Sequence, residues 1–168
     1  MNMLLQDNRA FTLIEMIVVT ALISIMLVVA IPRLSGGLFA GGSDDTARWV
    51  IGTVRRLKEK SVVDQKTYLL NVSPDIQRMW VTTADMTDAD SDAAREEGYR
   101  LPGGTNIDNV AYHQNERLSS GTIPIAFYPQ GYSDKAIIRI RTGDGGRLAL
   151  IIEPFLANVE LVSGREGW

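Results

Sequence analysis

Hydrophobic and polar residues are distributed very unevenly along this chain. Residues 11–31 (FTLIEMIVVTALISIMLVVAI) contain a single charged residue, Glu15, in 21 positions. A helix rises 1.5 Å per residue, so this segment would span about 31 Å, the thickness of a bilayer core. The pattern predicts a long N-terminal hydrophobic helix that crosses a membrane.

The order of polar and apolar residues around this helix differs from that of an ordinary secretory signal. Such a signal has a basic start, a short apolar run and then a small-residue cleavage site. Here the polar residues 1–10 (MNMLLQDNRA) precede a long apolar run, and Pro32, Arg33 and Leu34 follow it. We therefore expect residues 11–31 to remain in the mature protein.

A break in the pattern follows the apolar run. Pro32 lacks a backbone donor and is expected to kink or end the helix. Four glycines occur in residues 35–42 (SGGLFAGG), and each disfavours a helix by about 1 kcal/mol relative to alanine. Residues 32–43 are thus predicted to form a hinge, with a plain loop as the alternative.

From Asp44 to about Asp64, apolar residues recur at helical spacing, and Ser43 and Asp44 are candidate caps. Charged residues occupy most of the opposite face. This predicts an amphipathic helix that packs on a sheet. The residues that repeat at this spacing are Ala47, Val50, Ile51, Val54, Leu57, Ser61 and Val62.

Beyond Lys66 the hydrophobic period falls to two residues, which is typical of strands. Gly143–Gly146 joins the fourth and fifth of the alternating runs as a hairpin turn, and a short strand is expected near Val159–Val162. The fold class is therefore α+β, with the two helices followed by six or seven strands of an antiparallel sheet or sandwich. The alternating runs lie at residues 68–72, 79–83, 123–128, 138–141 and 147–152.

The amino-acid composition excludes several kinds of functional site. The chain has no cysteine, which excludes disulfides, thiolate metal sites and cysteine nucleophiles. Of its 17 basic and 20 acidic residues, two of each precede Asp44, so residues 44–168 keep the whole net charge of −3. This mild acidity suits a water-soluble domain and does not indicate nucleic acid as the main partner.

Glu15 is the one charge in the apolar helix. A carboxylate within a spanning helix costs about 2.5–3.5 kcal/mol near the bilayer centre. One interpretation is that Glu15, near the helix start, reaches the membrane interface. The other is that it pairs with a positive group, the best candidate being an α-amino group freed on a neighbouring copy by a cut before Phe11.

The run Arg9-Ala10-Phe11-Thr12-Leu13-Ile14-Glu15 resembles the type III signal of type IV pilins and type II secretion pseudopilins. By position, Ala10 matches the residue before the cut, Phe11 the N-methylated residue, and Glu15 the acidic fifth residue. Pro32 matches a proline common in these helices. Two departures are that Ala10 replaces the usual glycine and that Arg9 is the only basic residue of the leader.

The layout of helix, hairpin and late strands resembles the minor pseudopilins of the GspH/FimT group. The resemblance implies a leader at 1–10, a transmembrane and filament-core helix at 11–31, and a periplasmic domain at 44–168. The subunit would be single-pass in the bacterial inner membrane, with no cofactor and no enzymatic activity. Its partners would be a prepilin peptidase, other major and minor pseudopilins, the inner-membrane secretion platform and the bilayer.

An alternative is a FimT-like minor type IV pilin that acts in pilus assembly or DNA uptake. Arg139, Arg141 and Arg147 could share the outer face of the predicted hairpin and contact DNA phosphates. The leading interpretation includes no nucleic acid. The sequence does not decide between the secretion and pilus systems.

Other sequence patterns are weaker candidates for functional sites. Asp88, Asp90 and Asp92 have the spacing of an EF-hand start, but Ala93 and Tyr99 replace the required glycine and glutamate. Residues 85–97 are therefore predicted to be a solvated, mobile loop, whose calcium binding stays open.

His113 is the only histidine, and no G-x-S-x-G motif surrounds any serine, so catalysis is not expected. Gly143–Gly146 lacks the spacing and the lysine of a phosphate-binding loop. We interpret it as a plain turn.

Overall fold

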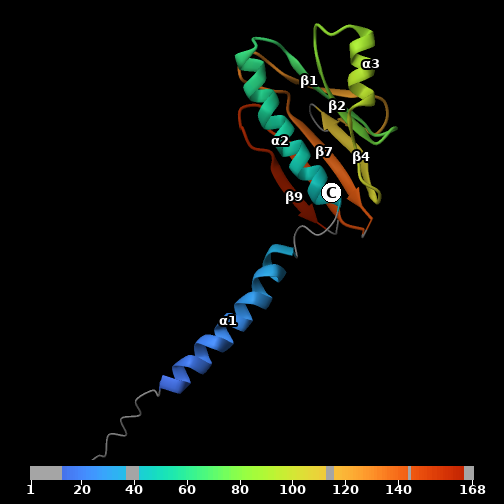
Figure 1. The fold of residues 1–168 in the computed structure, drawn as a ribbon. Helices are drawn as coiled ribbons and strands as arrows, with labels where there is room; N and C mark the ends of the chain where they lie inside the picture. The colour runs from blue at the N-terminus through green and yellow to red at the C-terminus, as the bar shows by residue number, and fades with distance from the viewer. Residues whose placement is uncertain (1–12, 37–41, 113–115, 144, 165–168) are drawn as a thin grey trace, which may run out of the picture. The chain divides into compact units, whose positions relative to one another are not determined.

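The computed structural model describes residues 13–36, 42–112, 116–143 and 145–164. The chain divides into two compact units, residues 1–40 and 41–168, which are described separately. Helix α1 (Leu13–Gly36) belongs to the first unit, and the remaining described helices and strands belong to the second (Figure 1).

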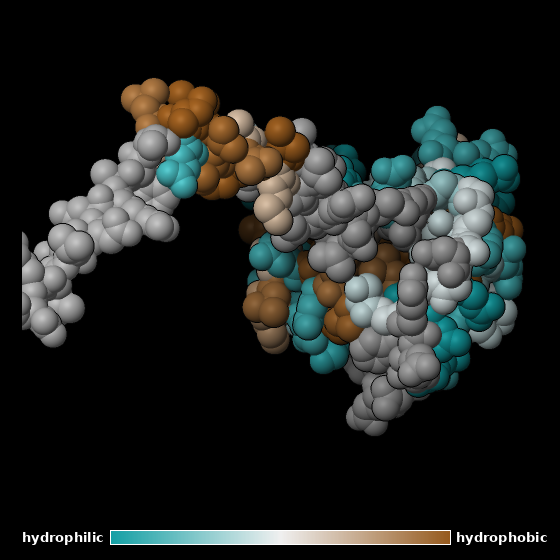
Figure 2. Space-filling view, turned by 90° about the horizontal axis from the view of Figure 1, so that it is seen from below, coloured by the Kyte–Doolittle hydropathy of each residue, from teal (hydrophilic) through white to brown (hydrophobic). Residues whose placement is uncertain are grey.

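From Leu13 to Met26, helix α1 carries apolar side chains on all sides. Between Leu13 and Met26 every large apolar side chain is exposed, from 42% for Val19 to 81% for Leu13. The two hydroxyls of this stretch bond to the helix's own backbone, Thr20 Oγ1 to Met16 O at 2.9 Å and Ser24 Oγ to Thr20 O at 2.8 Å. The described surface of α1 is mostly brown in Figure 2. A helix with both the length and the hydropathy needed to cross a membrane is not found among the described residues.

Pro32 does not end this helix. Helix α1 continues through Pro32 and ends four residues later, at Gly36, so the expectation that the helix stops at the proline is not met. A kink at Pro32 stays a prediction. Residues 37–41 of the expected hinge lie outside the described residues.

Helix α2 (Gly42–Val63) confirms the predicted amphipathic helix. It begins two residues before Asp44, so Ser43 and Asp44 lie in its first turn and are not its caps. Asp44 instead accepts a hydrogen bond from Arg48 Nη2, one turn further along, at 2.8 Å. The apolar face of the helix is buried along its length through Ala47, Val50, Val54 and Leu57.

The strands form two antiparallel sheets. Sheet A has the order β3-β2-β1-β6 and sheet B the order β5-β4-β7-β8-β9. The strands of sheet A are β1 (Tyr68–Ser73), β2 (Arg78–Thr83), β3 (Tyr99–Arg100) and β6 (Ile123–Phe127). Those of sheet B are β4 (Thr105–Tyr112), β5 (Glu116–Leu118), β7 (Ala136–Thr142), β8 (Arg147–Ile152) and β9 (Glu160–Gly164).

One hydrophobic core lies between helix α2 and the two sheets. Helix α2 contacts β1 and β6 of sheet A as well as β7 and β8 of sheet B, and it runs across both in Figure 1. The predicted α+β class is confirmed, although β3, β4 and β5 were not predicted. Fully buried core side chains come from all three layers and include Val50, Val54, Leu70, Ile125, Phe127, Ile138 and Leu150.

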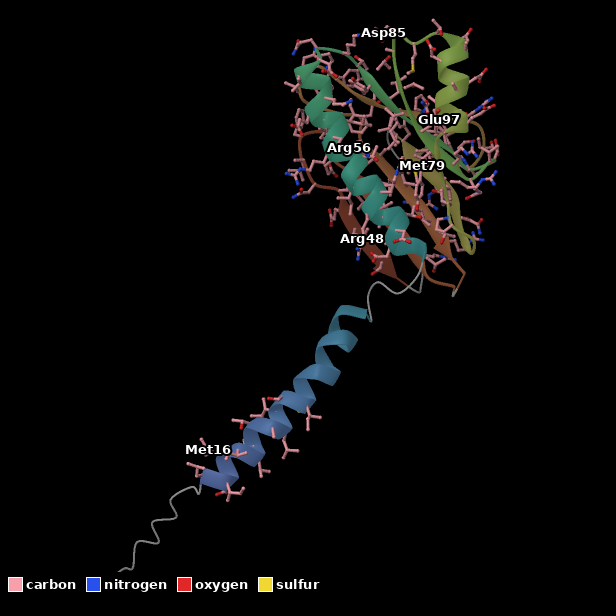
Figure 3. The ribbon with its side chains drawn as sticks, in the orientation of Figure 1. Met16, Arg48, Arg56, Met79, Asp85 and Glu97 are labelled. Atoms are coloured by element: carbon pink, nitrogen blue, oxygen red, sulfur yellow. The ribbon has the colours of Figure 1, made fainter. Side chains whose placement is uncertain are left out.

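The acidic segment 85–97 contains a helix, α3 (Asp88–Glu96), so the prediction of a mobile loop is wrong. Thr87 caps this helix by accepting a hydrogen bond from Asp90 N at 3.3 Å. Helix α3 contacts β2, and Gly98 lets the chain return closely, since a Cβ there would lie 2.8 Å from Met79 O and from Trp80 Cβ. Figure 3 shows Asp85 before the helix and Glu97 after it.

Asp134 links the two sheets from the connection between β6 and β7. Its carboxylate accepts hydrogen bonds from Ala126 N of sheet A at 2.9 Å and from the hydroxyl of Tyr112 in sheet B. The Tyr128 hydroxyl also donates to it, at 3.2 Å. Burial, reinforced by the neighbouring carboxylate, raises the pKa of both Tyr112 and Tyr128, so both phenols are held in their protonated, donating form.

We expect Asp134→Ala to lower the free energy of unfolding of residues 42–168 by about 3 kcal/mol. Hydrogen bonds to a charged group contribute about 1.5–3 kcal/mol each. The substitution removes the acceptor of three such bonds, but the partly exposed hydroxyls of Tyr112 and Tyr128 can bond to water instead, so the loss is smaller than the sum. Urea denaturation checks the value. Glu59→Ala, an exposed change on α2, is the control and should stay within about 0.5 kcal/mol of wild type. An equally small loss for Asp134→Ala would contradict the linking role.

Candidate functional site

The first candidate site is the N-terminal end of helix α1. Ala10 and Phe11, the predicted cleavage residues, lie outside the described residues. Glu15 lies in the first turn of α1, where an acidic side chain is favoured by the helix dipole. Its neighbours Leu13 and Ile14 are 81% and 66% exposed, so the carboxylate stands on an otherwise apolar surface.

This arrangement suits burial against something other than the chain's own core. Exposed large apolar side chains gain about 1.5–3 kcal/mol each when removed from water. Between Leu13 and Met26 ten such side chains are available, and Met16 is one of them (Figure 3). A carboxylate buried along with them needs a cation nearby, which is the chemistry of a charge-paired assembly helix.

The second candidate site is a basic hollow on sheet B. The structure brings together the three arginines expected on the hairpin, Arg139 and Arg141 of β7 and Arg147 of β8. It adds Arg117 of β5, which the sequence did not point to. The hollow has a volume of about 50 Å³, and Asp108 is the one acidic residue in its wall.

Strand register explains why a hollow forms there. Ala149 and Asn109 lie directly opposite Arg139 on the two neighbouring strands, and the small Ala149 leaves room between the longer side chains. Arg139 Nη1 donates to Asn109 Oδ1 at 3.0 Å, and its buried Nε has no hydrogen-bond partner.

Charge in the hollow is strongly positive. Arg141 forms an ion pair with Asp108, the single carboxylate among the four arginines. Burial, together with the positive charge of Arg117, lowers the pKa of Arg139. An anionic group would relieve this repulsion and supply the acceptor that Arg139 Nε lacks. Phosphate contact by these residues remains a prediction.

The remaining sequence patterns do not converge on a site in the described residues. Asp90 accepts a hydrogen bond from the Thr87 hydroxyl at 2.7 Å, and Asp92 pairs with Arg95 at 3.1 Å, so α3 uses both carboxylates internally. Within the described ranges, no three His, Cys, Asp or Glu side chains are grouped as a metal site. His113 lies outside them.

Gly143–Gly146 is the turn between β7 and β8. Thr142 N donates to Gly146 O at 2.9 Å, which closes the turn. Gly145 has a φ of 81°, a conformation that glycine adopts without strain. This agrees with the interpretation of the segment as a plain turn.

Comparison with known proteins finds similarity both in the N-terminal sequence and in the fold. Residues 5–31 match the model of the prokaryotic N-terminal methylation motif. No curated protein sequence matches the chain. A solved structure of the minor pseudopilin EpsH, from the type 2 secretion system of Vibrio cholerae, is similar with a TM-score of 0.50 and 9% sequence identity. The alignment covers 68% of this chain and 97% of that one.

A second crystal structure of the same Vibrio cholerae pseudopilin has a TM-score of 0.48 and 10% identity, over 67% of this chain and 94% of that one. Because the identity to EpsH is so low, the likeness concerns the fold. The resemblance inferred from Arg9–Glu15 is confirmed. The chain is pilin-like in its N-terminal motif and in its fold.

We expect calcium to leave the stability of residues 42–168 unchanged, because α3 holds Asp88, Asp90 and Asp92 on a helix and not around one point. The melting temperature in about 5 mM CaCl2 should equal that in EDTA within about 1 °C, since a ligand raises stability only when it binds the folded state, by RT ln(1 + L/Kd) for a free ligand concentration L. Thermal unfolding followed by circular dichroism is the measurement. A rise of several degrees that Asp90→Asn removes would show that the segment binds calcium.

Proposed function

We propose that this chain is a minor pseudopilin, a structural subunit of the periplasmic pseudopilus of a type II protein secretion system. The observation that carries the proposal is the methylation motif at residues 5–31, of which residues 13–31 lie on helix α1, where the large apolar side chains from Leu13 to Met26 are all exposed. The likeness of the fold to a minor pseudopilin supports the same assignment.

The proposed maturation follows from the motif. A prepilin peptidase removes residues 1–10 by cutting between Ala10 and Phe11, and the new N-terminus at Phe11 is methylated. Residues 11–31 then anchor the subunit in the bacterial inner membrane, and residues 32–43, which include Pro32, act as a hinge. The domain formed by residues 44–168 lies in the periplasm.

Assembly in this proposal transfers the α1 helix from lipid to a bundle of like helices. The apolar side chains of α1 suit both environments, and the hydroxyls of Thr20 and Ser24 are already bonded within the helix. Glu15 is the charged residue of this stretch, and the α-amino group of a neighbouring subunit is its proposed partner in the assembled filament. The pair sets the axial register between subunits.

The subunit acts by assembly and not by catalysis. Its proposed partners are the prepilin peptidase, the other major and minor pseudopilins and the inner-membrane secretion platform. The domain supplies no catalytic residues in this proposal, so the energy for filament growth comes from other components of the system.

We expect Glu15→Val to leave membrane insertion intact but to reduce incorporation into filaments by about tenfold, because loss of a buried charge pair costs at least about 1.4 kcal/mol. Sheared filaments are quantified by immunoblot, and mass spectrometry checks that both proteins start at a methylated Phe11. Thr20→Val removes a polar group of the same helix and is the matched control. Normal incorporation of Glu15→Val beside wild-type partners, or a mature protein that keeps Met1, would contradict the proposal.

The second candidate function is that of a minor type IV pilin that contacts DNA. It is favoured by one specific observation, the four arginines around the hollow on sheet B. Guanidinium groups bind phosphate oxygens in a planar, two-point geometry. The net charge of −3 opposes broad, non-specific attraction, so contact would depend on this hollow.

Under this second function, Arg141→Gln combined with Arg147→Gln should weaken DNA binding by residues 42–168 and lower the salt dependence by about two phosphate contacts. Gel-shift titrations at several salt concentrations measure both quantities. Arg55→Gln combined with Arg100→Gln removes the same charge from exposed positions outside the hollow and is the control. If wild-type protein does not bind at low salt, this second function is removed.

A further inference from the structure

The hollow on sheet B gathers an excess of positive charge at one point. Its wall contains four guanidinium groups and a single carboxylate, that of Asp108, which already forms an ion pair with Arg141. Strand register adds to the repulsion, because Arg141 lies directly opposite Arg147 on the neighbouring strand. Like charges in directly opposite positions destabilise a sheet. An added anion would therefore stabilise the wall of the hollow.

Arg139 gives this charge a direction. Its Nη1 group donates to Asn109 Oδ1 at 3.0 Å, which fixes the guanidinium in the wall of the hollow. Its Nε group is buried and has no hydrogen-bond partner among the described residues. A guanidinium offers its donors in planar pairs, and a pair that includes Nε matches the two oxygens of one carboxylate. The donor that the fold leaves unsatisfied is therefore one that a carboxylate can use.

A bulge in β4 builds one side of the hollow. The register shifts between Ile107 and Asn109, and Asp108 and Asn109 both line the hollow although they are consecutive. In a regular strand, consecutive side chains point to opposite faces. Bulges re-aim side chains in this way and are over-represented beside active sites. One local irregularity thus supplies both the carboxylate that holds Arg141 and the amide that holds Arg139.

The hollow can admit a ligand without a change of fold. Ala149, a small buried residue, lies opposite Arg139 on the neighbouring strand. Arg117, Arg141 and Arg147 are exposed, and exposed side chains change rotamer within nanoseconds. These three arginines can therefore rearrange around an entering group while Asn109 keeps Arg139 in place.

The arrangement suits a single anionic group better than a nucleic-acid backbone. Duplex DNA carries one charge for about each 1.7 Å of its axis, and proteins bind it through a basic surface that reaches several phosphates. Here the four arginines line one hollow of about 50 Å³, and the net charge of the chain is −3. This net charge repels a polyanion more than it repels one carboxylate.

We propose that the hollow on sheet B binds an aspartate or glutamate side chain of another protein subunit, with Arg139 as the two-point donor and Arg117 and Arg147 as the surrounding charges. The inference rests on the proposed function, because the neighbours of a subunit in a pseudopilus are proteins, whose anionic side chains are carboxylates. The contact joins this chain to a different subunit once and does not repeat along the filament, as suits a minor component.

Nuclear magnetic resonance of isotope-labelled residues 42–168 tests the chemistry, since these residues contain the whole described hydrophobic core and lie within one compact unit. The probe is glutamate blocked at both backbone ends, and blocked glutamine is the neutral probe of the same shape. The Arg139 Nε–H signal should shift and reach saturation with blocked glutamate and should not respond to blocked glutamine. Absence of a response to blocked glutamate would overturn the proposal.

The same titration, followed through the Ala149 backbone amide, compares variants. Arg139→Gln should raise the Kd for blocked glutamate by about tenfold, since that factor corresponds to about 1.4 kcal/mol and a hydrogen bond to a charged group contributes at least that much. Arg147→Gln, at an exposed side chain, should raise it by about threefold and keeps the test valid if Arg139→Gln does not fold. Arg55→Gln removes the same charge from an exposed position on α2 and is the matched control, with an unchanged Kd.

Inorganic phosphate and a short DNA duplex are the competing probes. Saturation of the same signals by either of them at a lower concentration than by blocked glutamate would overturn the carboxylate assignment. Saturation by the duplex would favour the second candidate function instead.

The full-length variants separate this inference from the proposed function. Mass spectrometry reads processing at Phe11, and immunoblots of sheared filaments read incorporation. Arg139→Gln and Arg147→Gln should be processed normally but incorporated less, by about tenfold and threefold, whereas Arg55→Gln should match wild type. Normal incorporation of both hollow variants would overturn the partner-subunit source of the carboxylate. A wild-type chain that keeps Met1 would instead contradict the proposed function, while the titration still decides whether the hollow binds a carboxylate.

Discussion

The domain depends on the burial of one face of helix α2 against two sheets at once. Sheets A and B are separately hydrogen-bonded, and Val50, Val54 and Leu57 fill the space where both meet the helix. Each of these side chains stabilises the fold by about 1.5–3 kcal/mol through burial. Asp134 adds a polar link between the same sheets. The hollow on sheet B lies on a surface that this arrangement leaves uncovered.

The elements predicted correctly are those whose periodicity survives in the fold. Helix α2 and the hairpin β7–β8 keep a regular spacing of apolar residues. Strand β4 does not, because a bulge between Ile107 and Asn109 shifts the register, so that Ile107 and Val110 are both buried although they are three residues apart. Helix α3 was missed because its acidic composition suggests a loop. Its cap, Thr87, is a local signal that could have indicated a helix, whereas its packing on β2 is a tertiary effect.

The candidate sites also differ in whether the sequence alone could predict them. The motif around Ala10, Phe11 and Glu15 is a contiguous chemical signal, so it could be predicted from the sequence alone. Arg117 joins the hollow only through the pairing of β4 with β5. Phe155 and Leu156 are exposed on a loop whose backbone is held by Lys58 of helix α2, 98 positions before Leu156. Neither arrangement could be inferred from spacing.

The position of α2 also has a mechanical consequence. Any pull transmitted along the chain from the N-terminal helix enters the domain at Gly42, the first residue of α2. Load along this helix acts as shear on all of its buried contacts together, and dispersion contacts that are weak singly resist strongly when they must slip at once. The contacts that carry this load are those of α2 with strands β1, β6, β7 and β8. A domain without disulfides can in this way transmit tension as one solid piece.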